Sequence, residues 1–239
     1  MRRVLATLAT TALILAGGCG GRSYEFRLDK TLEDMRYRKR LDDNLMPAPT
    51  KTKLETFNIF VRPPKNLVQS KEFLLTVLEP GKFDVADSFN DDKQSVMHVL
   101  AWVKLPKTPA KKGAAEPASA ARTGNFNTEV VALLNGVYNV EIDATKAKEV
   151  SKRNNKFKHL AFEANGKNVQ VYFIGTKSQP PEVALIFEYP KTEQAALVSK
   201  IDLCLGSFAT GEKARRAFTG SVGEEESTEG GAPAGPGAF

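Results

Sequence analysis

Hydrophobic residues recur at every second position in several short segments of the chain, which is the period of a strand with one buried face. Phe57, Ile59 and Val61 alternate in this way with polar residues, and two prolines end the run. The segment from Ser95 to Leu105 is apolar on both faces and predicts a central strand covered on two sides. The strands expected in the first half of the chain are Phe57–Val61, Phe73–Leu78, Phe83–Val85 and Ser95–Leu105.

The second half carries the clearest turn, Asn165-Gly166, between two stretches of alternating residues. A two-residue Asn-Gly loop closes an antiparallel hairpin, because both residues adopt a positive φ at low cost. Residues equally far from the turn then face each other, so His159 is expected opposite Tyr172. After a loop at 175–182, a further strand at 183–189 completes a three-stranded meander.

A period near 3.6 residues replaces the alternation in other segments and predicts helices. Residues 127–137 form one, with Asn127 as the N-cap. Residues 192–208 form another, whose apolar face is expected to lie against the sheet. Residues 138–142 are expected to be extended and residues 144–153 to form a short charged helix. The apolar face of the last helix consists of Leu197, Ile201, Cys204, Leu205 and Phe208.

Residues 28–45 are dense in charge and predict an exposed helix or stalk, with Thr31 and Asp34 at the spacing of a capping box. A thin apolar stripe runs along it. We expect this stripe to pack on the domain, and docking of a partner helix is the alternative. The stripe consists of Leu28, Leu32, Met35 and Leu45.

These elements together predict an α+β fold, an antiparallel sheet flanked by helices. The stretch 106–124 is rich in Ala, Lys, Pro and Ser and predicts a mobile loop within one globular domain at 54–218. The tail 219–239 is acidic and rich in Gly and Pro and predicts disorder. Residues 19–53 are expected to contain an anchor, the charged helix and a proline-containing spacer.

The first residues have the pattern of a secretory leader. Arg2 and Arg3 precede an apolar run that is too short to cross a bilayer comfortably, and small residues follow before Cys19. This arrangement resembles the lipobox of bacterial lipoproteins. The resemblance implies that residues 1–18 are a signal peptide removed by cleavage, and that Cys19 is acylated on its thiol and new amino terminus. The residue after the cysteine is Gly20, whereas lipoproteins that are retained in the inner membrane have an aspartate at this position. The resemblance therefore implies that the protein resides in the outer membrane.

The order of elements in the domain resembles a second family. A strand at Phe57–Val61, the late meander and a closing helix that ends in Leu205-Gly206-Ser207-Phe208 are similar to the PsbP-like α/β sandwich family. The resemblance covers about 54–208 and implies a sheet with helices on both sides. Members of that family are mostly non-catalytic assembly or binding subunits.

The charge and the cysteine content of the chain limit the kinds of partner and the cross-links that can be expected. The chain has 34 basic and 28 acidic residues, and loss of Arg2 and Arg3 with the leader lowers the net charge from +6 to +4. Basic and acidic residues alternate along most segments, which argues against nucleic-acid binding. If Cys19 is acylated, Cys204 is the only thiol left and no intramolecular disulfide can form. Cys204 is expected to be a small buried hydrophobe.

The sequence contains little catalytic chemistry. It has only two histidines, His98 and His159, far apart, so neither zinc nor another cofactor is expected. A Gly-Ser-Val-Gly stretch at 220–223 lies in the tail and is not a nucleophile elbow. His159 with Tyr172 is the only suggestive polar pair. The acidic residues Asp84, Asp87, Asp91 and Asp92 lack calcium-loop spacing and are expected in an exposed loop.

The sequence therefore predicts a lipid-anchored, periplasm-facing envelope protein that is not an enzyme. It would act as a binding or scaffold module, with membrane lipid held through Cys19 and an envelope protein as partner. The alternative is an envelope hydrolase whose site is assembled from carboxylates scattered along the chain.

Overall fold

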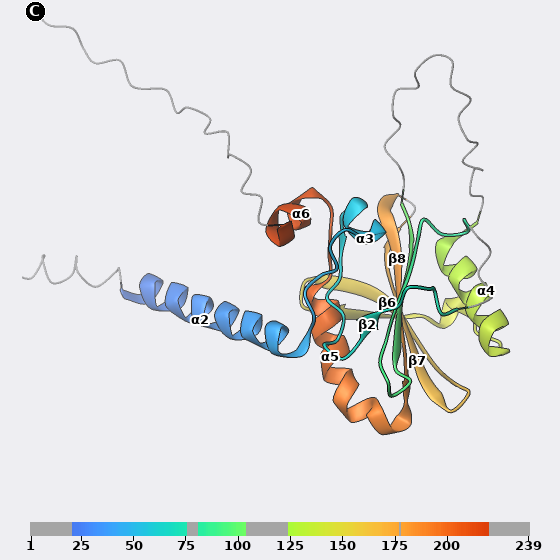
Figure 1. The fold of residues 1–239 in the computed structure, drawn as a ribbon. Helices are drawn as coiled ribbons and strands as arrows, with labels where there is room; N and C mark the ends of the chain where they lie inside the picture. Colours follow the sequence, from blue (N-terminus) through green and yellow to red (C-terminus); the bar gives the residue numbers. More distant parts are fainter. Residues whose placement is uncertain (1–20, 76–80, 104–123, 177, 220–239) are drawn as a thin grey trace, which may run out of the picture.

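A computed structural model describes residues 21–75, 81–103, 124–176 and 178–219 (Figure 1). The predicted signal peptide, Cys19, nearly all of the 106–124 loop and the tail from residue 220 lie outside these ranges. The helices are α2 (Gly21–Asn44), α3 (Lys53–Thr56), α4 (Phe126–Tyr138), α5 (Gln194–Ser207) and α6 (Glu212–Thr219), with 3-10 turns η1 (Ala144–Lys146) and η2 (Lys191–Glu193). The strands are β1 (Ile59–Phe60), β2 (Val68–Gln69), β3 (Val85–Asn90), β4 (Val96–Trp102), β5 (Lys148–Lys152), β6 (Asn155–Ala164), β7 (Lys167–Thr176), β8 (Gln179–Pro190) and β9 (Ala209–Thr210).

Seven of these strands form one antiparallel sheet in the order β2-β3-β4-β8-β7-β6-β5. The short strands β1 and β9 pair separately. The predicted α+β class with an antiparallel sheet and flanking helices is therefore confirmed. The apolar segment at Ser95–Leu105 is β4, which lies between β3 and β8 inside the sheet, with residues 104 and 105 outside the described ranges.

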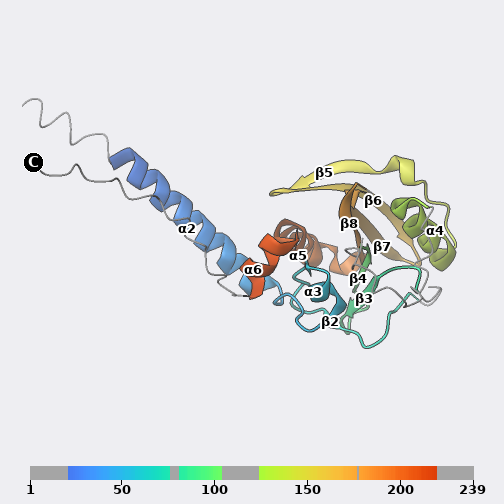
Figure 2. The ribbon, with the colours of Figure 1, turned by 90° about the horizontal axis from the view of Figure 1, so that it is seen from above.

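Helices cover both faces of the sheet, α4 on one and α5 on the other (Figures 1 and 2). On the α4 side, Val130 and Leu134 pack in one buried cluster with Leu100 and Ile186 of the sheet. On the α5 side, a larger cluster joins the helix to the opposite faces of β4, β7 and β8. Its α5 members are Leu197, Ile201, Cys204 and Leu205, as the sequence predicted.

The Asn-Gly hairpin is confirmed in detail. Asn165 and Gly166 both have positive φ, 51° and 77°, and join β6 to β7. His159 pairs with Tyr172 in the ladder, and their rings stack with centroids 4.5 Å apart. Strand β8 completes the predicted meander, although it begins at Gln179, inside the segment expected to be a loop.

Several predictions in the first half are wrong. The expected strand Phe57–Val61 is reduced to two residues, because Thr52 caps the helical turn α3 and Asn58 takes a left-handed φ of 55°. Residues 73–75 of the second expected strand are irregular, and residues 76–78 lie outside the described ranges. The third expected strand starts later and is longer, since β3 runs to Asn90.

Three further predictions, on the segment from Asn125 to Arg153, also need correction. The first turn of α4 is capped by the Asn125 side chain, which accepts a hydrogen bond from the Asn127 backbone N–H, so Asn127 is not the N-cap. Residues 139–143 are irregular instead of extended. The segment 144–153 is not a helix, because after η1 it forms the edge strand β5, which pairs with β6.

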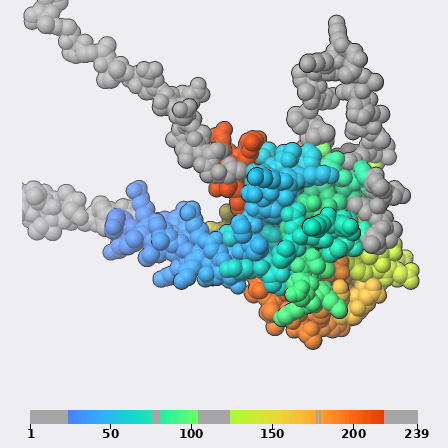
Figure 3. All heavy atoms as spheres, in the orientation of Figure 1, coloured from blue at the N-terminus to red at the C-terminus, as the bar shows by residue number. Residues whose placement is uncertain are grey.

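Helix α2 is longer than predicted and stands away from the body of the protein (Figure 3). Thr31 is an interior residue whose hydroxyl donates to the Arg27 carbonyl, so the capping-box prediction is wrong. The stripe does not pack on the domain either, except at its end. Leu45 is buried, whereas Leu28, Leu32 and Met35 are 45%, 40% and 62% exposed.

Candidate functional site: a groove beside helix α2

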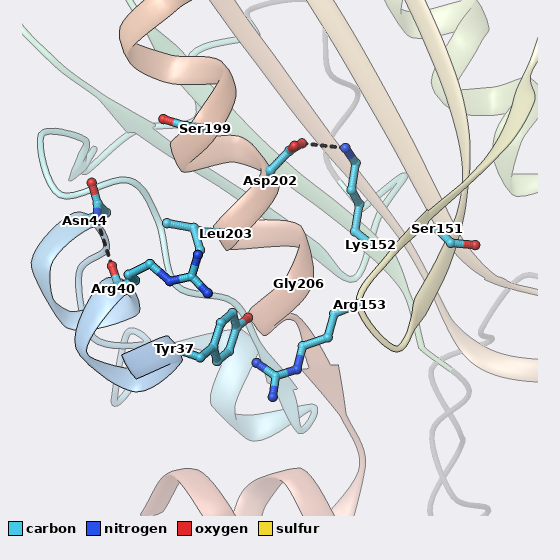
Figure 4. Close-up of a pocket in the computed structure, with 10 residues that line it drawn as sticks. All are labelled: Tyr37, Arg40, Asn44, Ser151, Lys152, Arg153, Ser199, Asp202, Leu203 and Gly206. Carbon is cyan, nitrogen blue, oxygen red and sulfur yellow. Dashed lines mark hydrogen bonds and ion pairs between the residues drawn. The ribbon is translucent and has the colours of Figure 1, made fainter. Parts of the chain in front are cut away.

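A groove of about 540 Å³ lies where the end of α2 meets α5 and the β5–β6 turn (Figure 4). Its size falls within the range of roughly 300–1,000 Å³ that is common for ligand sites. Three elements far apart in the sequence form its walls. They contribute Tyr37, Arg40 and Asn44 from α2, Ser151 and Lys152 from the end of β5, Arg153 from the β5–β6 turn, and Ser199, Asp202, Leu203 and Gly206 from α5.

Tyr37 lies between two arginines in this groove (Figure 4). The Arg153 guanidinium lies 3.6 Å from the centroid of the tyrosine ring, and the Arg40 guanidinium lies 5.8 Å from it. Both distances are within the range of cation–π attraction. Arg40 is exposed and forms no ion pair with any residue in the described part of the chain. Its five donors are therefore open to a ligand.

Arg153 occupies a backbone conformation that costs energy. It is the first residue of the β5–β6 turn and has a φ of 55°, a region that disfavours side chains with a Cβ. Its side chain offsets this cost by stacking on Tyr37 and by an ion pair of 3.1 Å with Asp34 of α2. The turn therefore aims Arg153 at α2 and holds the helix against the domain. We call Asp34, Tyr37 and Arg153 the α2 clasp.

Helix α5 supplies the opposite wall. Asp202 pairs with Lys152 across the groove at 2.7 Å. Gly206 leaves space for Tyr37, since a Cβ built at this glycine would come within 3.1 Å of the tyrosine hydroxyl oxygen. That hydroxyl is buried and has no hydrogen-bond partner among the described residues.

The groove is suited to binding polar and anionic groups. It combines three cationic side chains with a single acidic one in its lining, and the Arg40 guanidinium is unpaired. Beside it, burial lowers the pKa of His159, and the nearby Lys152 charge lowers it further. His159 therefore stays neutral and stacked on Tyr172. It does not line the groove, and this pair suggested by the sequence has a packing role.

A second polar cluster on the α4 side has the connectivity of a hydrolytic triad. Ser88 and His98 lie 2.8 Å apart between Oγ and Nδ1, and His98 Nε2 lies 2.8 Å from Glu188 Oε1. Burial raises the pKa of Glu188, but the hydrogen bond and charge of His98, the hydrogen bond of Tyr138 and the charge of Lys167 together lower it, and the net shift is downward. Ser88 is 1% exposed, and its Oγ accepts a hydrogen bond from the Leu74 N–H. A substrate cannot reach this serine, so the cluster satisfies buried polar groups.

The remaining candidates from the sequence are spread apart. Asp87 lies in β3 and not in an exposed loop, and burial raises its pKa. Asp91 accepts hydrogen bonds from backbone N–H groups of the β3–β4 turn. Cys204 is fully buried, which raises the pKa of its thiol and leaves it unreactive.

The described ranges contain neither a candidate metal site nor a candidate membrane-spanning helix. No group of three or more His, Cys, Asp and Glu side chains could hold a metal ion there. No helix within them combines the length and the apolar character that a membrane span requires.

The groove itself was missed by the sequence reasoning. Tyr37 and Arg40 lie in a charged helix, and Lys152 and Arg153 lie in a segment misassigned as a helix. The hydrophobic periodicity of the sequence could not have revealed these residues, because most of their side chains are polar and partly exposed. The one usable signal was the Arg153-Asn154-Asn155 stretch, whose asparagines favour a turn.

Comparison with known proteins finds a similarity in structure but no match in sequence. No protein-family model matches the chain, and no curated protein matches it. Among solved structures, it is similar to the solution structure of cyanobacterial PsbP (CyanoP) from Synechocystis sp. PCC 6803. The TM-score is 0.41 with 10% identity, over 70% of this chain and 93% of that chain. This is the kind of likeness that the sequence predicted, and it carries no conclusion about binding, activity or location.

Proposed function

We propose that this chain is a lipid-anchored protein of the cell envelope that acts as a non-catalytic binding or assembly module. Acylated Cys19 would hold it in the membrane, the outer membrane in preference to the inner, with the domain facing the periplasm. The groove beside α2 would hold an envelope protein partner. No nucleic acid, metal or cofactor enters this proposal.

The geometry of α2 is consistent with the proposed lipid anchor at Cys19. The helix begins at Gly21, two residues after Cys19, and continues without a break to the domain at Asn44. Its 24 residues span about 36 Å at 1.5 Å per residue. The α2 clasp fixes the domain end of this helix. An anchor at Cys19 would therefore present the groove at a set height above the membrane.

One observation supports the proposal that the groove binds a protein partner. Arg40 presents an unpaired guanidinium above the ring of Tyr37, inside a groove whose other charged residues are already paired. A cationic group that no described acceptor satisfies is a ready contact for carboxylates of a partner. Binding is favoured over catalysis because the groove offers a recognition surface without an acid and base pair facing a common point.

The anchor is tested on the purified full chain by mass spectrometry. Removal of residues 1–18 and an acyl mass on Cys19 are expected, and Cys19→Ala should move the chain out of the membrane fraction. An intact leader, an unmodified thiol at residue 19, or identical fractionation of both forms would contradict the anchor.

The groove is tested by a photoreactive residue placed in the native membrane at Leu203, which lines the groove. A discrete protein adduct is expected there, and none from the same probe at Val198, which is exposed on α5 outside the groove. Arg40→Glu should abolish the adduct, whereas Arg36→Glu, one turn earlier on α2 and not among the residues that line the groove, should preserve it. Equal losses in the two variants would reject the groove as the binding site.

The hydrolase alternative has a test of its own, because the buried triad-like cluster names its nucleophile. A serine-directed fluorophosphonate should leave Ser88 unlabelled in the native protein, since Ser88 is almost fully buried. Labelling that the Ser88→Ala variant loses would make the chain a hydrolase.

A further inference from the structure

Exposed hydrophobic side chains are concentrated on the outer part of α2. Among the described residues, nine large hydrophobic side chains are exposed, and five of them lie between residues 24 and 35 of this helix. Isolated exposed apolar residues are ordinary on protein surfaces, but a contiguous patch marks an interaction site. The helix therefore needs a partner that the domain does not supply.

Four of these side chains form one line, which we call the outer stripe: Tyr24, Leu28, Leu32 and Met35. Their spacing of four, four and three residues places them on one face of a helix with 3.6 residues per turn. They are 68%, 45%, 40% and 62% exposed. Tyr37 and Leu41, which contact the domain, lie on the other side of α2.

We propose that the outer stripe pairs with the outer stripe of a second copy of this chain, in parallel and in register. The inference rests on the proposed lipid anchor at Cys19, because the anchor puts the same end of each helix at the same membrane. The partner is thus another α2 helix, and the interface is formed by equivalent residues on a two-fold axis along the helices.

Charge on the two borders of the stripe supports this pairing. Glu25, Asp29 and Arg36 lie on one border, and Arg27 and Arg38 lie on the other, as their positions on the helix require. A parallel two-fold axis sets one border against the opposite border of the second copy. Glu25 and Asp29 then lie at the height of Arg27 in the partner, where unlike charges attract along the stripe. The like charges Arg36 and Arg38 face each other only past Met35, beyond the stripe.

The placement of the domain also allows it. The domain lies at the C-terminal end of α2 (Figures 2 and 3) and packs on the face that bears Tyr37 and Leu41, so it leaves the outer stripe uncovered. Both grooves would stay open, since Arg40 and Tyr37 are not part of the stripe.

The size of the stripe explains why the anchor matters. Four side chains on each helix are far fewer than the roughly 20–30 residues per partner of a standard interface. Such a pair is weak in dilute solution. Confinement to one membrane surface raises the effective concentration and makes a weak contact effective. Dimerisation is therefore expected in the membrane and should be lost on dilution without it.

Disulfide trapping in native membranes tests the parallel pair. In a parallel, in-register pair each stripe residue meets its own copy, so Met35→Cys and Leu28→Cys should each give a cross-linked dimer under mild oxidation. Glu33→Cys, on the opposite side of α2, is the matched control and should give at least tenfold less dimer. Background is low because Cys204, the other thiol besides Cys19, is fully buried.

Each result decides the matter. Cross-linking at Met35→Cys that an added Leu28→Glu abolishes supports the pair. No dimer, or equal dimer from Glu33→Cys, overturns it even when the chain is in the membrane fraction, and the anchor proposal then stands. Dimer only between Leu28→Cys and Met35→Cys chains mixed together would mean antiparallel helices and also overturns it. A chain absent from the membrane would refute the anchor and this inference together.

Discussion

Helices α5 and α2 use their apolar residues in opposite ways. Helix α5 has 14 residues and buries four of them, including Ile201 and Cys204, against the sheet. Helix α2 has 24 residues and buries only Leu41 among its described side chains. The comparison teaches that α5 belongs to the hydrophobic core, whereas α2 is attached at one end and leaves the apolar face of its outer part exposed.

Polar contacts attach the end of α2. Arg62 pairs with Asp42 at 2.9 Å and donates from Nε to the Met46 carbonyl, and the Lys65 N–H donates to the Asn44 carbonyl. The α2 clasp adds a contact further along the helix. Exposed ion pairs of this kind contribute little energy each, typically below about 1 kcal/mol. The buried Leu41 and Leu45 attach the end of α2 and the directional contacts set its orientation, whereas α5 is buried along its whole apolar face.

The largest effect is expected at the centre of α5. Ile201→Ala removes buried methyl groups from a side chain that is 1% exposed and leaves a cavity. The free energy of unfolding should fall by about 2–5 kcal/mol. Urea unfolding followed by circular dichroism measures the change. A loss below 1 kcal/mol would mean that α5 is not part of the core.

Two substitutions at Tyr37 separate its ring from its hydroxyl. Tyr37→Ala removes the platform for Arg153 and should lower the free energy of unfolding by about 1 kcal/mol. Tyr37→Phe keeps the ring and removes a buried, unpartnered hydroxyl, so stability should be unchanged or slightly higher. The same unfolding experiment compares them. A larger loss in Tyr37→Phe than in Tyr37→Ala would contradict the role of the ring.

Arg153→Gly tests orientation without a large change in stability. Glycine removes the cost of a positive φ, of order 1 kcal/mol, while the stacking and the ion pair with Asp34 are lost, so the net change should be small. Amide hydrogen exchange of α2 near Asp34 should nevertheless become faster. Unchanged exchange there would show that the clasp does not hold the helix.

Leu32→Ser should have almost no effect on the isolated domain. The side chain is 40% exposed and contacts no core cluster, so the unfolding free energy should change by less than about 0.5 kcal/mol. In membranes, the same substitution should reduce Met35→Cys cross-linking. A clear loss of stability would mean that the stripe is buried against the protein's own domain.

The smallest effect concerns protonation beside the α5 wall. Lys152→Met removes a positive charge that helps to lower the pKa of His159, so this pKa should rise toward its ordinary value of 6.5. A histidine with a lowered pKa loses stability as the pH falls below its unfolded value, and the variant should lose less. NMR titration of His159 measures the shift. A fall in the pKa would contradict this account.

Local turn chemistry and complete alternation made parts of the fold predictable. Asn165-Gly166 defined the hairpin register down to the stacked pair of His159 and Tyr172, and the face of α5 followed from its period. The edge strand β5 was mistaken for a helix because Lys148 to Lys152 is mostly exposed and shows no burial pattern. The strand at Phe57 failed because a Thr52 cap and a left-handed Asn58 interrupt the alternation.

The amino-acid sequence alone determined the leader pattern before Cys19, the class of fold and the line of apolar residues along α2, because each depends on residues close together in the chain. The tertiary structure decided which side of α2 faces the domain and which residues meet in the groove. Tyr37, Arg153 and Asp202 come from three separate elements, and their proximity depends on how α2 and α5 pack beside the β5–β6 turn. Periodicity identifies the faces of a helix, but only packing between distant segments decides which face remains free.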